Sequence, residues 1–451
     1  MANHTLHTDR TVDERSDVPR GDSDGAREDS YDAVIAGASL AGCATAILLA
    51  RHGARVALVE RKPGPDAFKR ICGHFIQSSA APALERLGLL EEIEGLGGVR
   101  SRLRLWTRWG LILPPQDSSL PRCVNLRRER LDPLVRRTAA NSPGVELIAG
   151  TSVEELVHQD GRACGVEARS REGRRVRLPA KLVIGADGRD SRVAELAGVK
   201  TRTTPHGRFS YAAYFEGPAP AGSPDATIWL LDPQWAAAFP TDSGLTMYAC
   251  MPTKDYLPEF KRDLAGALVR FLSDLPDAPP IAESRMVSPV LGKIEMPNLR
   301  RGPVAPGLAL VGDAALATDP LWGVGCGWAF QSAEWLAESV APGLLGEEPV
   351  ERGLQRYRKR FRGQLAGHTA LIHDYATGRS FSPVERLLFS AAARDAGLAA
   401  RLEAFGTRHV APERSMPSML ARAVAVNVRH RLRRGAWWSG DSPRMGWAHG
   451  R

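Results

Sequence analysis

The sequence predicts an α/β protein with a parallel-sheet core, a separate antiparallel sheet and a C-terminal helical region. Glycine-rich strand-to-helix segments at 31–64 and 307–338 predict the parallel core. Short β-like stretches between 209 and 252, each bounded by Pro, Gly or Asp, predict the antiparallel sheet. Residues 346–451 have a mostly helical pattern.

The first glycine segment predicts a Rossmann-like βαβ unit that binds a dinucleotide. The three positions of its G-x-G-x-x-G pattern are Gly37, Ser39 and Gly42. The pattern lies between an apolar strand and an apolar helix, and the next strand ends on Glu60, where a carboxylate can reach ribose hydroxyls. Ser39 replaces the middle glycine and places a small hydroxyl side chain where the backbone approaches pyrophosphate.

The second glycine segment repeats this local pattern. Residues 308–311 suit a buried strand, and Gly323, Gly325 and Gly327 leave the backbone bare before the helix predicted at 328–338. A helix start of this kind attracts anionic or polarised ligand atoms. Such turns are common in α/β proteins, so this segment gains its meaning from the first one.

The rest of the chain alternates between helical and strand patterns. We expect a helix at 79–94, a strand at 103–113, a strand-to-helix unit at 123–140, a β-meander at 146–188 and a helix at 261–274. The first 30 residues carry eight acidic residues and four arginines with few apolar groups, so we expect a disordered tail without a signal peptide.

Charge and composition favour a cytoplasmic enzyme without a structural metal. No apolar run is long enough to span a bilayer, and the six cysteines form no C-x-x-C pair, so we expect packed, reduced thiols and neither zinc nor disulfides. The net charge of +9 arises in residues 351–451, which hold 19 Lys and Arg against seven Asp and Glu. The basic runs 356–362 and 429–434, the second followed by Trp437, Trp438 and Trp447, suit an anionic membrane or nucleic-acid surface or a solvated helical face. We favour the solvated face and expect no nucleic-acid partner, because no nucleic-acid fold signature accompanies the charge.

A third motif brings a family into view. The Asp-Gly pair of GADG (185–188) follows a strand, and it stands in order between GASLAG (37–42) and GDAALATDP (312–320). Over 31–345 the chain therefore resembles FAD-dependent monooxygenases of the para-hydroxybenzoate hydroxylase type, the group A flavoprotein monooxygenases. The resemblance implies a Rossmann-like FAD-binding domain, an antiparallel β-sheet substrate domain and one FAD stretched between them. The implied divisions are a tail at 1–30, FAD-binding parts at 31–205 and 291–345, a substrate domain at 206–290 and a helical region at 346–451.

The resemblance also implies roles at the adenosine end of FAD. The backbone at the first glycine turn faces the pyrophosphate, and Glu60 holds the adenosine ribose. Arg61 is a charge at the rim, with an NADP phosphate ligand as the alternative. Val153 resembles a residue that contacts adenine, with a plain core valine as the alternative, and Asp187 organises its turn and assists nucleotide contacts.

Further roles concern the flavin end. Arg128 begins an R-x-x-L pattern and lies along the FAD, the alternative being a surface arginine. Asp313 resembles the carboxylate that accepts a ribityl hydroxyl. Arg70 contacts flavin or nicotinamide, or else forms a surface salt bridge. The loop along the flavin ring comprises Pro320, Gly323, Gly325, Cys326 and Gly327. The family often has asparagine where this chain has Gly327, and Cys326 is a packing residue with a catalytic thiol as the alternative.

The implied chemistry is hydroxylation or epoxidation of an aromatic or polyketide-like molecule, typical of secondary metabolism. NADPH or NADH reduces the flavin, O2 adds to it, and a flavin hydroperoxide transfers oxygen. A separate flavin reductase remains an open alternative as electron source. His74 is the candidate proton-transfer residue, with a structural histidine as the alternative. The candidate pocket residues, which also suit an ordinary core, are Tyr214, Trp229, Trp235 and Phe239.

Three alternatives stay open. A geranylgeranyl-type reductase places a Cys-Gly pair as Cys72-Gly73 stands here, and it would reduce an alkene without oxygen. A flavin halogenase needs a lysine near the flavin and a W-x-W-x-I-P stretch, whereas no lysine lies between Lys69 and Lys181 and Trp106 and Trp109 have another spacing. The non-enzymatic alternative is a flavin-binding scaffold.

Overall fold

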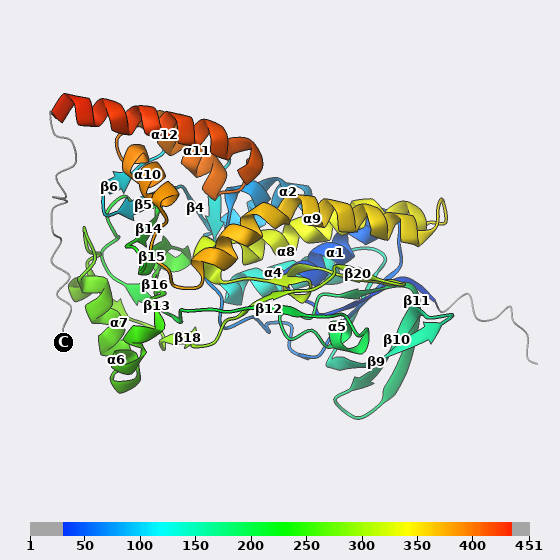
Figure 1. Ribbon diagram of the computed structural model, residues 1–451. Coiled ribbons are helices and arrows are strands. Elements are labelled where there is room, and N and C mark those ends of the chain that lie inside the picture. The colour runs from blue at the N-terminus through cyan, green and yellow to red at the C-terminus, as the bar shows by residue number, and fades with distance from the viewer. Residues whose placement is uncertain (1–29, 435–451) are drawn as a thin grey trace, which may run out of the picture.

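The computed structural model describes residues 30–434 of the 451-residue chain. The expected N-terminal tail and the three tryptophans after residue 434 lie outside the described residues. The elements form a parallel sheet with its helices, an antiparallel sheet beside it, and C-terminal helices over the end of that second sheet (Figure 1).

The parallel sheet confirms the predicted α/β core. The strand order along its main path is β20-β21-β11-β1-β2-β8, and on this path only β20 runs antiparallel to its neighbour. The strands are β1 (Tyr31–Ala36), β2 (Val56–Glu60), β8 (Val145–Ala149), β11 (Arg175–Gly185), β20 (Val304–Ala305) and β21 (Leu308–Leu310). Residues of β1 and β2 are almost all buried, as expected of parallel strands covered on both faces.

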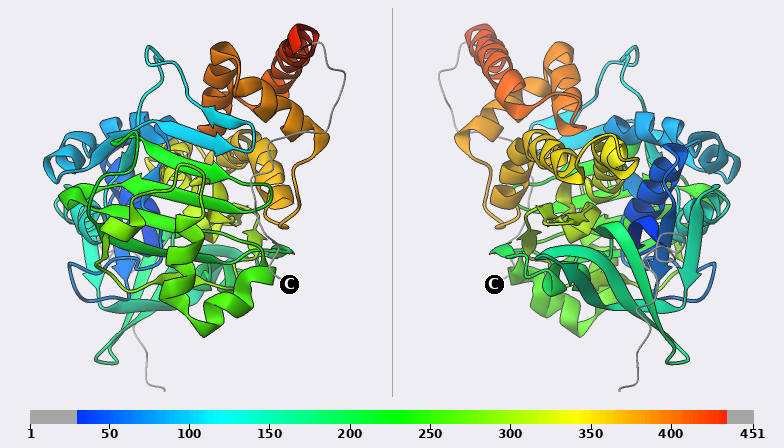
Figure 2. Two further views of the ribbon diagram at one scale, coloured as in Figure 1. Left: turned by 90° about the vertical axis from the view of Figure 1, so that its left-hand side faces the viewer. Right: turned by 90° about the vertical axis from the view of Figure 1, so that its right-hand side faces the viewer.

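Helices of both glycine segments cover this sheet. Helix α1 (Leu40–Arg51) packs against α8 (Gly325–Leu344), so the two glycine turns lie on the same side of the molecule (Figure 2). Helix α4 (Arg128–Ala140) packs on α1, and α5 (Arg192–Leu196) follows β11. The predicted meander is also present, because β9 (Thr151–Gln159) pairs antiparallel with β10 (Arg162–Ser170), and β10 pairs antiparallel with β11.

The antiparallel sheet has the order β17-β13-β16-β15-β14-β5-β6, with β18 beside β13. Its strands are β5 (Leu103–Thr107), β6 (Gly110–Ile112), β13 (Ser210–Glu216), β14 (Ala226–Leu230), β15 (Trp235–Pro240), β16 (Thr246–Cys250), β17 (Arg285–Met286) and β18 (Leu291–Lys293). The single strand expected at 103–113 is a hairpin. Since β5 pairs in parallel with β14, this hairpin extends the antiparallel sheet beyond the segment 206–290.

One predicted helix is wrong in extent. The segment 79–94 is split into α2 (Ala81–Arg86) and α3 (Leu90–Gly95). Gly88 has a φ of +72°, and the amide of Leu89 donates to the carbonyl of Leu84, which ends the first helix in a left-handed turn. The apolar periodicity continues across the break because both helices bury the same side.

The C-terminal region is helical, as predicted. It comprises α9 (Val350–Tyr375), α10 (Pro383–Ala392), α11 (Ala396–Gly406) and α12 (Pro412–Arg434). In the basic run on α9, Tyr357 and Phe361 are buried and the arginines between them are exposed, which agrees with a solvated helical face. Side chains of α10, α11 and α12 form one core with Ile112 of β6.

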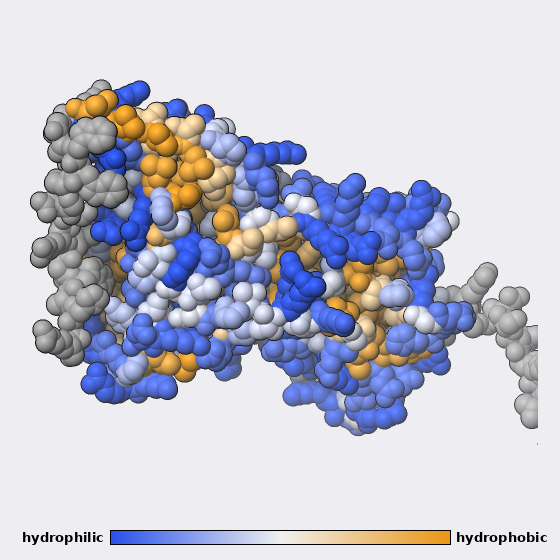
Figure 3. Space-filling model, viewed as in Figure 1, coloured by the Kyte–Doolittle hydropathy of each residue, from blue (hydrophilic) through white to orange (hydrophobic). Residues whose placement is uncertain are grey.

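The remaining elements complete the layers. Helices α6 (Leu257–Arg262) and α7 (Leu264–Ser273) cover one face of the antiparallel sheet. Two small sheets consist of β3 (Phe75–Ile76), β7 (Cys123–Asn125) and β4 (Val99–Ser101), and of β12 (Arg202–Thr204), β19 (Asn298–Arg300) and β22 (Leu316–Ala317). No helix in the described part of the chain is both long and apolar enough to cross a bilayer. The face seen in Figure 3 is largely hydrophilic, with apolar areas on the right-hand part of the molecule and over the C-terminal helices, where Val424, Val428 and Leu432 are exposed.

Candidate functional site

The first glycine turn is a tight meeting point of strand and helix. Gly37 has a φ of +103°, and a Cβ atom there would lie 2.7 Å from the carbonyl oxygen of Ala186. A Cβ atom on Gly42 would overlap the carbonyl oxygen of Gly37. Both positions therefore require glycine for close packing, whatever ligand the turn holds.

Glu60 is buried at the end of β2 and fixes this turn. One carboxylate oxygen accepts the amide of Ala38 at 2.8 Å, and the other accepts the amide of Lys62 at 2.9 Å. Arg136 of α4 donates to the carbonyl oxygen of Ala38 at 3.1 and 3.2 Å. Arg136 was missed in the sequence, although its spacing of i, i+4 and i+8 with Arg128 and Asp132 places the three on one helix face.

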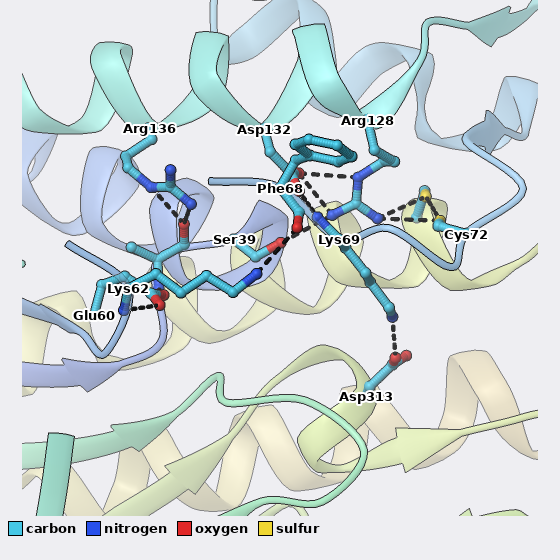
Figure 4. Close-up of polar contacts among 12 residues, drawn as sticks. Ser39, Glu60, Lys62, Phe68, Lys69, Cys72, Arg128, Asp132, Arg136 and Asp313 are labelled. Atoms are coloured by element: carbon cyan, nitrogen blue, oxygen red, sulfur yellow. Dashed lines mark hydrogen bonds and ion pairs between the residues drawn. The ribbon is translucent and has the colours of Figure 1, made fainter. Parts of the chain in front are cut away.

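Arg128 is buried and joins four side chains (Figure 4). It donates to Asp132 at 2.6 and 2.9 Å, to the hydroxyl of Ser39 at 2.9 Å and to the Cys72 sulfur at 3.1 Å. Although burial lowers the pKa of Arg128, the Cys72 and Asp132 groups raise it above its ordinary value. The structure thus excludes a surface position and brings Arg128 to both glycine segments, since Cys326 lies 4.0 Å from the same guanidinium.

Asp313 lies in a 3₁₀ turn after β21 and pairs with Lys69. The Lys69 ammonium is 2.9 Å from a carboxylate oxygen of Asp313, and the Lys69 amide donates to Asp132 at 2.8 Å. Burial raises the pKa of Asp313, but the Lys69 charge and hydrogen bond outweigh this effect and hold it below its usual range. The ion pair connects residues 61–74, called the 61–74 loop below, to the second glycine segment.

Both glycine segments leave helix N-termini available to a ligand. Neither α1, with N-cap Ser39, nor α8, with N-cap Val324, receives a side-chain capping hydrogen bond, and neither has an acidic residue in its first turn. Free first-turn amides attract phosphate and polarised oxygen atoms. A Cβ atom on Gly325 would find open space, whereas one on Gly323 would meet the Phe75 ring at 2.6 Å. The donors at these turns fit the pyrophosphate and the ring edge of FAD.

The antiparallel sheet presents an aromatic face to the second glycine segment. Tyr214, Trp235 and Phe239 form one apolar cluster with Phe75 and Leu321. Trp229 does not lie on this face, so the expected pocket loses one of its four residues. It faces α6 and α7 on the opposite side of the sheet, where its indole donates to the Pro276 carbonyl at 2.8 Å, because strand alternation pairs it with Ala236 and not with Trp235.

His74 lies on this aromatic face in an unusual position. It is fully buried, has a φ of +40°, and stacks on Tyr214 with ring centroids 5.8 Å apart. Within residues 30–434 neither ring nitrogen has a hydrogen-bond partner. Burial lowers the pKa of His74 to about 4, so the ring is neutral at pH 7. A buried, unsatisfied imidazole is costly and suits a ligand-binding position.

A buried ion pair lies beside this histidine. Arg127 donates to Asp242 at 2.7 and 2.9 Å and stands 5.8 Å from the centre of the Tyr214 ring. The Asp242 side chain is fully buried, and although burial raises its pKa, the Arg127 hydrogen bonds lower it below the usual value. Neither residue was singled out in the sequence, because their pairing joins segments 115 positions apart.

The remaining predicted residues occupy several places. Arg61 and Arg70 are exposed on the 61–74 loop, and Val153 is half-buried on β9 against the main core. Asp187 accepts from the Ser191 hydroxyl at 2.5 Å and the Val193 amide at 3.0 Å, so it organises the start of α5. Pro320 begins the 3₁₀ turn Pro320–Trp322, and Cys326 and Gly327 lie in the first turn of α8. The Cys72 and Cys326 sulfurs are 3.7 Å apart.

Known proteins share this fold. The brominase Bmp2 matches with a TM-score of 0.71 and 18% identity over 90% of this chain and all of the other. The p-nitrophenol 4-monooxygenase PnpA from Pseudomonas putida matches with a TM-score of 0.69 and 22% identity over 84% of this chain and 98% of the other. In sequence, a digeranylgeranylglycerophospholipid reductase from Methanococcoides burtonii is 24% identical over 76% of this chain and 82% of its own length.

The family follows from a sequence model. The model of an FAD binding domain matches residues 30–366, a range that includes both glycine turns, Glu60, Arg128 and Asp313. The chain belongs to the FAD binding domain family and is an FAD-dependent oxidoreductase.

Proposed function

We propose that this protein is an FAD-dependent monooxygenase of the cytoplasm that uses NADPH or NADH and O2 to hydroxylate or epoxidise an aromatic or polyketide-like molecule. The observation that carries the proposal is the aromatic sheet face against the Pro320–Trp322 turn, with an unpartnered His74 on it. FAD supplies the redox and oxygen-transfer chemistry when bound. The chain must then bind and orient the substrate, exclude water and place a proton.

The cofactor would be held by the residues of both glycine segments. First-turn amides of α1 and the Arg128 guanidinium suit the pyrophosphate, and Glu60 suits the adenosine ribose. Asp313 suits the ribityl chain, and the first turn of α8 suits the ring edge. The Lys69 side chain now pairs with Asp313, so we expect it to give way to a ribityl hydroxyl or to share the carboxylate.

The substrate would lie against the aromatic face. A neutral imidazole both donates and accepts a hydrogen bond, so His74 can hold a phenol or a hydroxyl group through either ring nitrogen. Tyr214, Trp235 and Phe239 supply an apolar wall that suits a ring system. The buried Arg127–Asp242 pair fixes the side of this wall and adds a positive charge over the Tyr214 ring.

The first test is the flavin itself and its need for oxygen. The purified protein should be yellow, and it should oxidise NADPH or NADH faster with a substrate from an aromatic panel, with product formation that stops under argon. A protein that cannot take up FAD would contradict the assignment. Activity that appears only when a separate flavin reductase is added would assign electron supply to a partner.

A pair of variants tests the proposed substrate side. His74→Ala should lower kcat by about 100-fold, the usual range for loss of a positioned proton-transfer group. His158→Ala serves as the control, because His158 is exposed on β9, and it should leave kcat unchanged. Equal activity of both variants would remove His74 from the mechanism.

A geranylgeranyl-type reductase is the second candidate. The archaeal lipid reductase resembles the chain over most of its length, and Cys72 lies beside the second glycine segment, as the Cys-Gly pair suggested. Alkene reduction that continues without oxygen would favour this candidate over the monooxygenase.

Halogenation needs a halide arm in the same assay. Lys69, which precedes the lysine-free stretch, pairs with Asp313 of the second glycine segment and could serve as the lysine that a halogenase needs. A product that requires chloride or bromide as well as oxygen would identify a halogenase. FAD binding without any turnover would leave the scaffold alternative.

A further inference from the structure

Two cysteines from distant parts of the chain meet beside the second glycine segment. The sulfurs of Cys72, on the 61–74 loop, and Cys326, in the first turn of α8, are 3.7 Å apart, although 254 positions separate them in sequence. A disulfide needs about 2.05 Å between the sulfurs, so a small shift of one side chain brings them into bonding distance. Cys326 is buried, whereas Cys72 is partly exposed and thus reachable by a small solute.

The surroundings of Cys72 favour its thiolate. The Arg128 guanidinium donates to the Cys72 sulfur at 3.1 Å, and Arg128 is itself fixed by Asp132 and Ser39. The hydrogen bond from Cys326 and the nearby charges of Arg128 and Lys69 lower the pKa of Cys72 although burial raises it. The same hydrogen bond and burial raise the pKa of Cys326. Cys72 is therefore the more readily ionised of the two thiols, and disulfide formation needs one thiolate and one thiol.

We propose that Cys72 and Cys326 form a peroxide-reactive thiol pair, in which Cys72 is the residue that attacks peroxide and Cys326 the resolving residue. This goes beyond the proposed oxygenation, and only the source of the oxidant, hydrogen peroxide released by uncoupled turnover, rests on that proposal. The other four cysteines lack such a pairing in the described residues: Cys43, Cys123 and Cys250 are buried, with thiol pKa values raised by burial, and Cys164 is half-buried on β10.

The reaction balances with one molecule of hydrogen peroxide. The Cys72 thiolate attacks one peroxide oxygen, so that an S–O bond forms, the O–O bond breaks and hydroxide leaves; sulfur is oxidised by two electrons and peroxide is reduced. The Cys326 sulfur then attacks the Cys72 sulfenic acid. An S–S bond forms, the S–O bond breaks, and the departing hydroxide takes the Cys326 proton as water.

The resulting disulfide would link the 61–74 loop to the first turn of α8. Lys69 lies on the 61–74 loop, and the first turn of α8 belongs to the flavin-side loop, defined as residues 320–327, which we expect to run along the flavin ring. At present the Lys69–Asp313 ion pair and the Arg128 contacts hold these segments together. A covalent link would fix this closed arrangement until a thiol reductant breaks it. Peroxide treatment would thus slow the uptake of FAD by the FAD-free protein, and dithiothreitol would restore the original rate.

The test uses the full-length reduced protein and added hydrogen peroxide, and it does not depend on turnover. We expect the six titratable thiols to fall to four and peptide mapping to show one cross-link, between Cys72 and Cys326. In Cys326→Ser, a dimedone adduct should accumulate on Cys72, and in Cys72→Ser the cross-link and the adduct should both be lost. Cys164→Ser is the matched control and should behave as the wild type.

A second measurement separates thiolate activation from simple proximity. At neutral pH we expect iodoacetamide to alkylate Cys72 about ten-fold faster than Cys164, because the thiolate is the reacting form and the surroundings of Cys72 favour it. Peroxide that leaves all six thiols titratable, or that oxidises Cys164 before Cys72, would overturn the proposal, and so would equal alkylation rates. If the serine variants do not fold, the wild-type cross-link map alone decides the matter. Absence of flavin turnover would not affect these readouts.

Discussion

At the scale of single residues, the Glu60 carboxylate fixes the first glycine turn and keeps lone pairs that a ligand can use. Its two oxygens accept amides on either side of the first glycine turn, so the turn is formed before any nucleotide arrives. Charged hydrogen bonds of this kind are worth about 1.5–3 kcal/mol each. A ribose hydroxyl needs only one additional lone pair, and each carboxylate oxygen offers two.

Removal of this carboxylate should therefore weaken FAD binding. Glu60→Ala frees the amides of Ala38 and Lys62, and we expect the Kd for FAD to rise by 10-fold or more, since about 1.4 kcal/mol corresponds to ten-fold. Fluorescence titration of the FAD-free protein measures this. Glu146→Ala is the control, because Glu146 pairs with the Tyr31 hydroxyl away from the turn, and it should leave the Kd unchanged.

His74 gives a prediction about pH. Its pKa is about 4 in the folded protein and about 6.5 in an unfolded chain, so between these values the unfolded chain binds more protons. Stability should therefore be intact above about pH 6.5 and fall as the pH drops towards 4, with a total contribution of about 3 kcal/mol. Cys72 and Asp242 raise this pKa, and Arg127 and Arg128 lower it, but burial is the largest cause.

Urea unfolding of His74→Gln at several pH values checks this sign. Between pH 6.5 and pH 4 the free energy of unfolding should fall less in the variant than in the wild type. Above pH 6.5 it should change with pH equally in both proteins. Comparison with His158→Gln removes general acid effects, since His158 is exposed. Parallel profiles of the wild type and His74→Gln would show that folding leaves the pKa of His74 unchanged, and so would contradict the lowered value.

At the scale of elements, sequence patterns were most informative where a segment is buried on both sides. Strands β1, β2 and β21 and the helices after the glycine turns were predicted because parallel strands and their helices have apolar runs bounded by glycine. The fold class and three motif positions followed from this. The face of Trp229 did not, because alternation within a strand fixes two faces without saying which one meets the cofactor.

The contacts between loops also escaped the sequence. Lys69 and Asp313 are 244 positions apart, and Cys72 and Cys326 are 254 apart, so no local periodicity relates them. Arg136 is the contrasting case, because its helical spacing from Arg128 was visible in the sequence. Tertiary pairing, and not propensity, decides which polar residues of a loop reach a site.

Alanine substitutions at two glycines should change the stability of the protein in opposite directions. Gly88 has a φ of +72° between α2 and α3, whereas Gly363 lies inside α9, and a Cβ atom would not clash at either position. Gly88→Ala should destabilise the protein by about 1 kcal/mol through backbone strain. Gly363→Ala should stabilise it by about 0.5–1 kcal/mol, because alanine loses less conformational freedom in a helix. Urea midpoints of both variants provide the measurement, and equal shifts would contradict the left-handed turn.

At the scale of the whole molecule, the C-terminal helices contact the cofactor-binding part through Arg408. This residue follows α11, donates to Gln331 of α8 at 2.9 Å and to Gln77, and lies 5.5 Å from the centre of the Trp328 ring. Gln77 in turn donates to the carbonyls of Trp322 at 2.6 Å and Gly406 at 3.1 Å. The flavin-side loop and the C-terminal region are thus parts of one hydrogen-bonded unit.

This contact accounts for the glycine at position 327. A Cβ atom on Gly327 would lie 2.8 Å from an Nη atom of Arg408, and the hydrogen bonds of that guanidinium leave it little room to move. The C-terminal arginine fills the volume that a side chain at 327 would take. Gly327→Ala should then destabilise the protein by about 1–2 kcal/mol, although alanine is the better helix former.

A double-mutant cycle isolates this coupling. In an Arg408→Ala background the clash is absent, so Gly327→Ala should be neutral or stabilising there, with a coupling energy of about 1–3 kcal/mol between the two positions. Urea unfolding of the four proteins gives the cycle. Additive effects would mean that Arg408 does not restrict position 327. A clear coupling would show that the C-terminal helices, and not only the first turn of α8, determine the side chain that the flavin-side loop accepts.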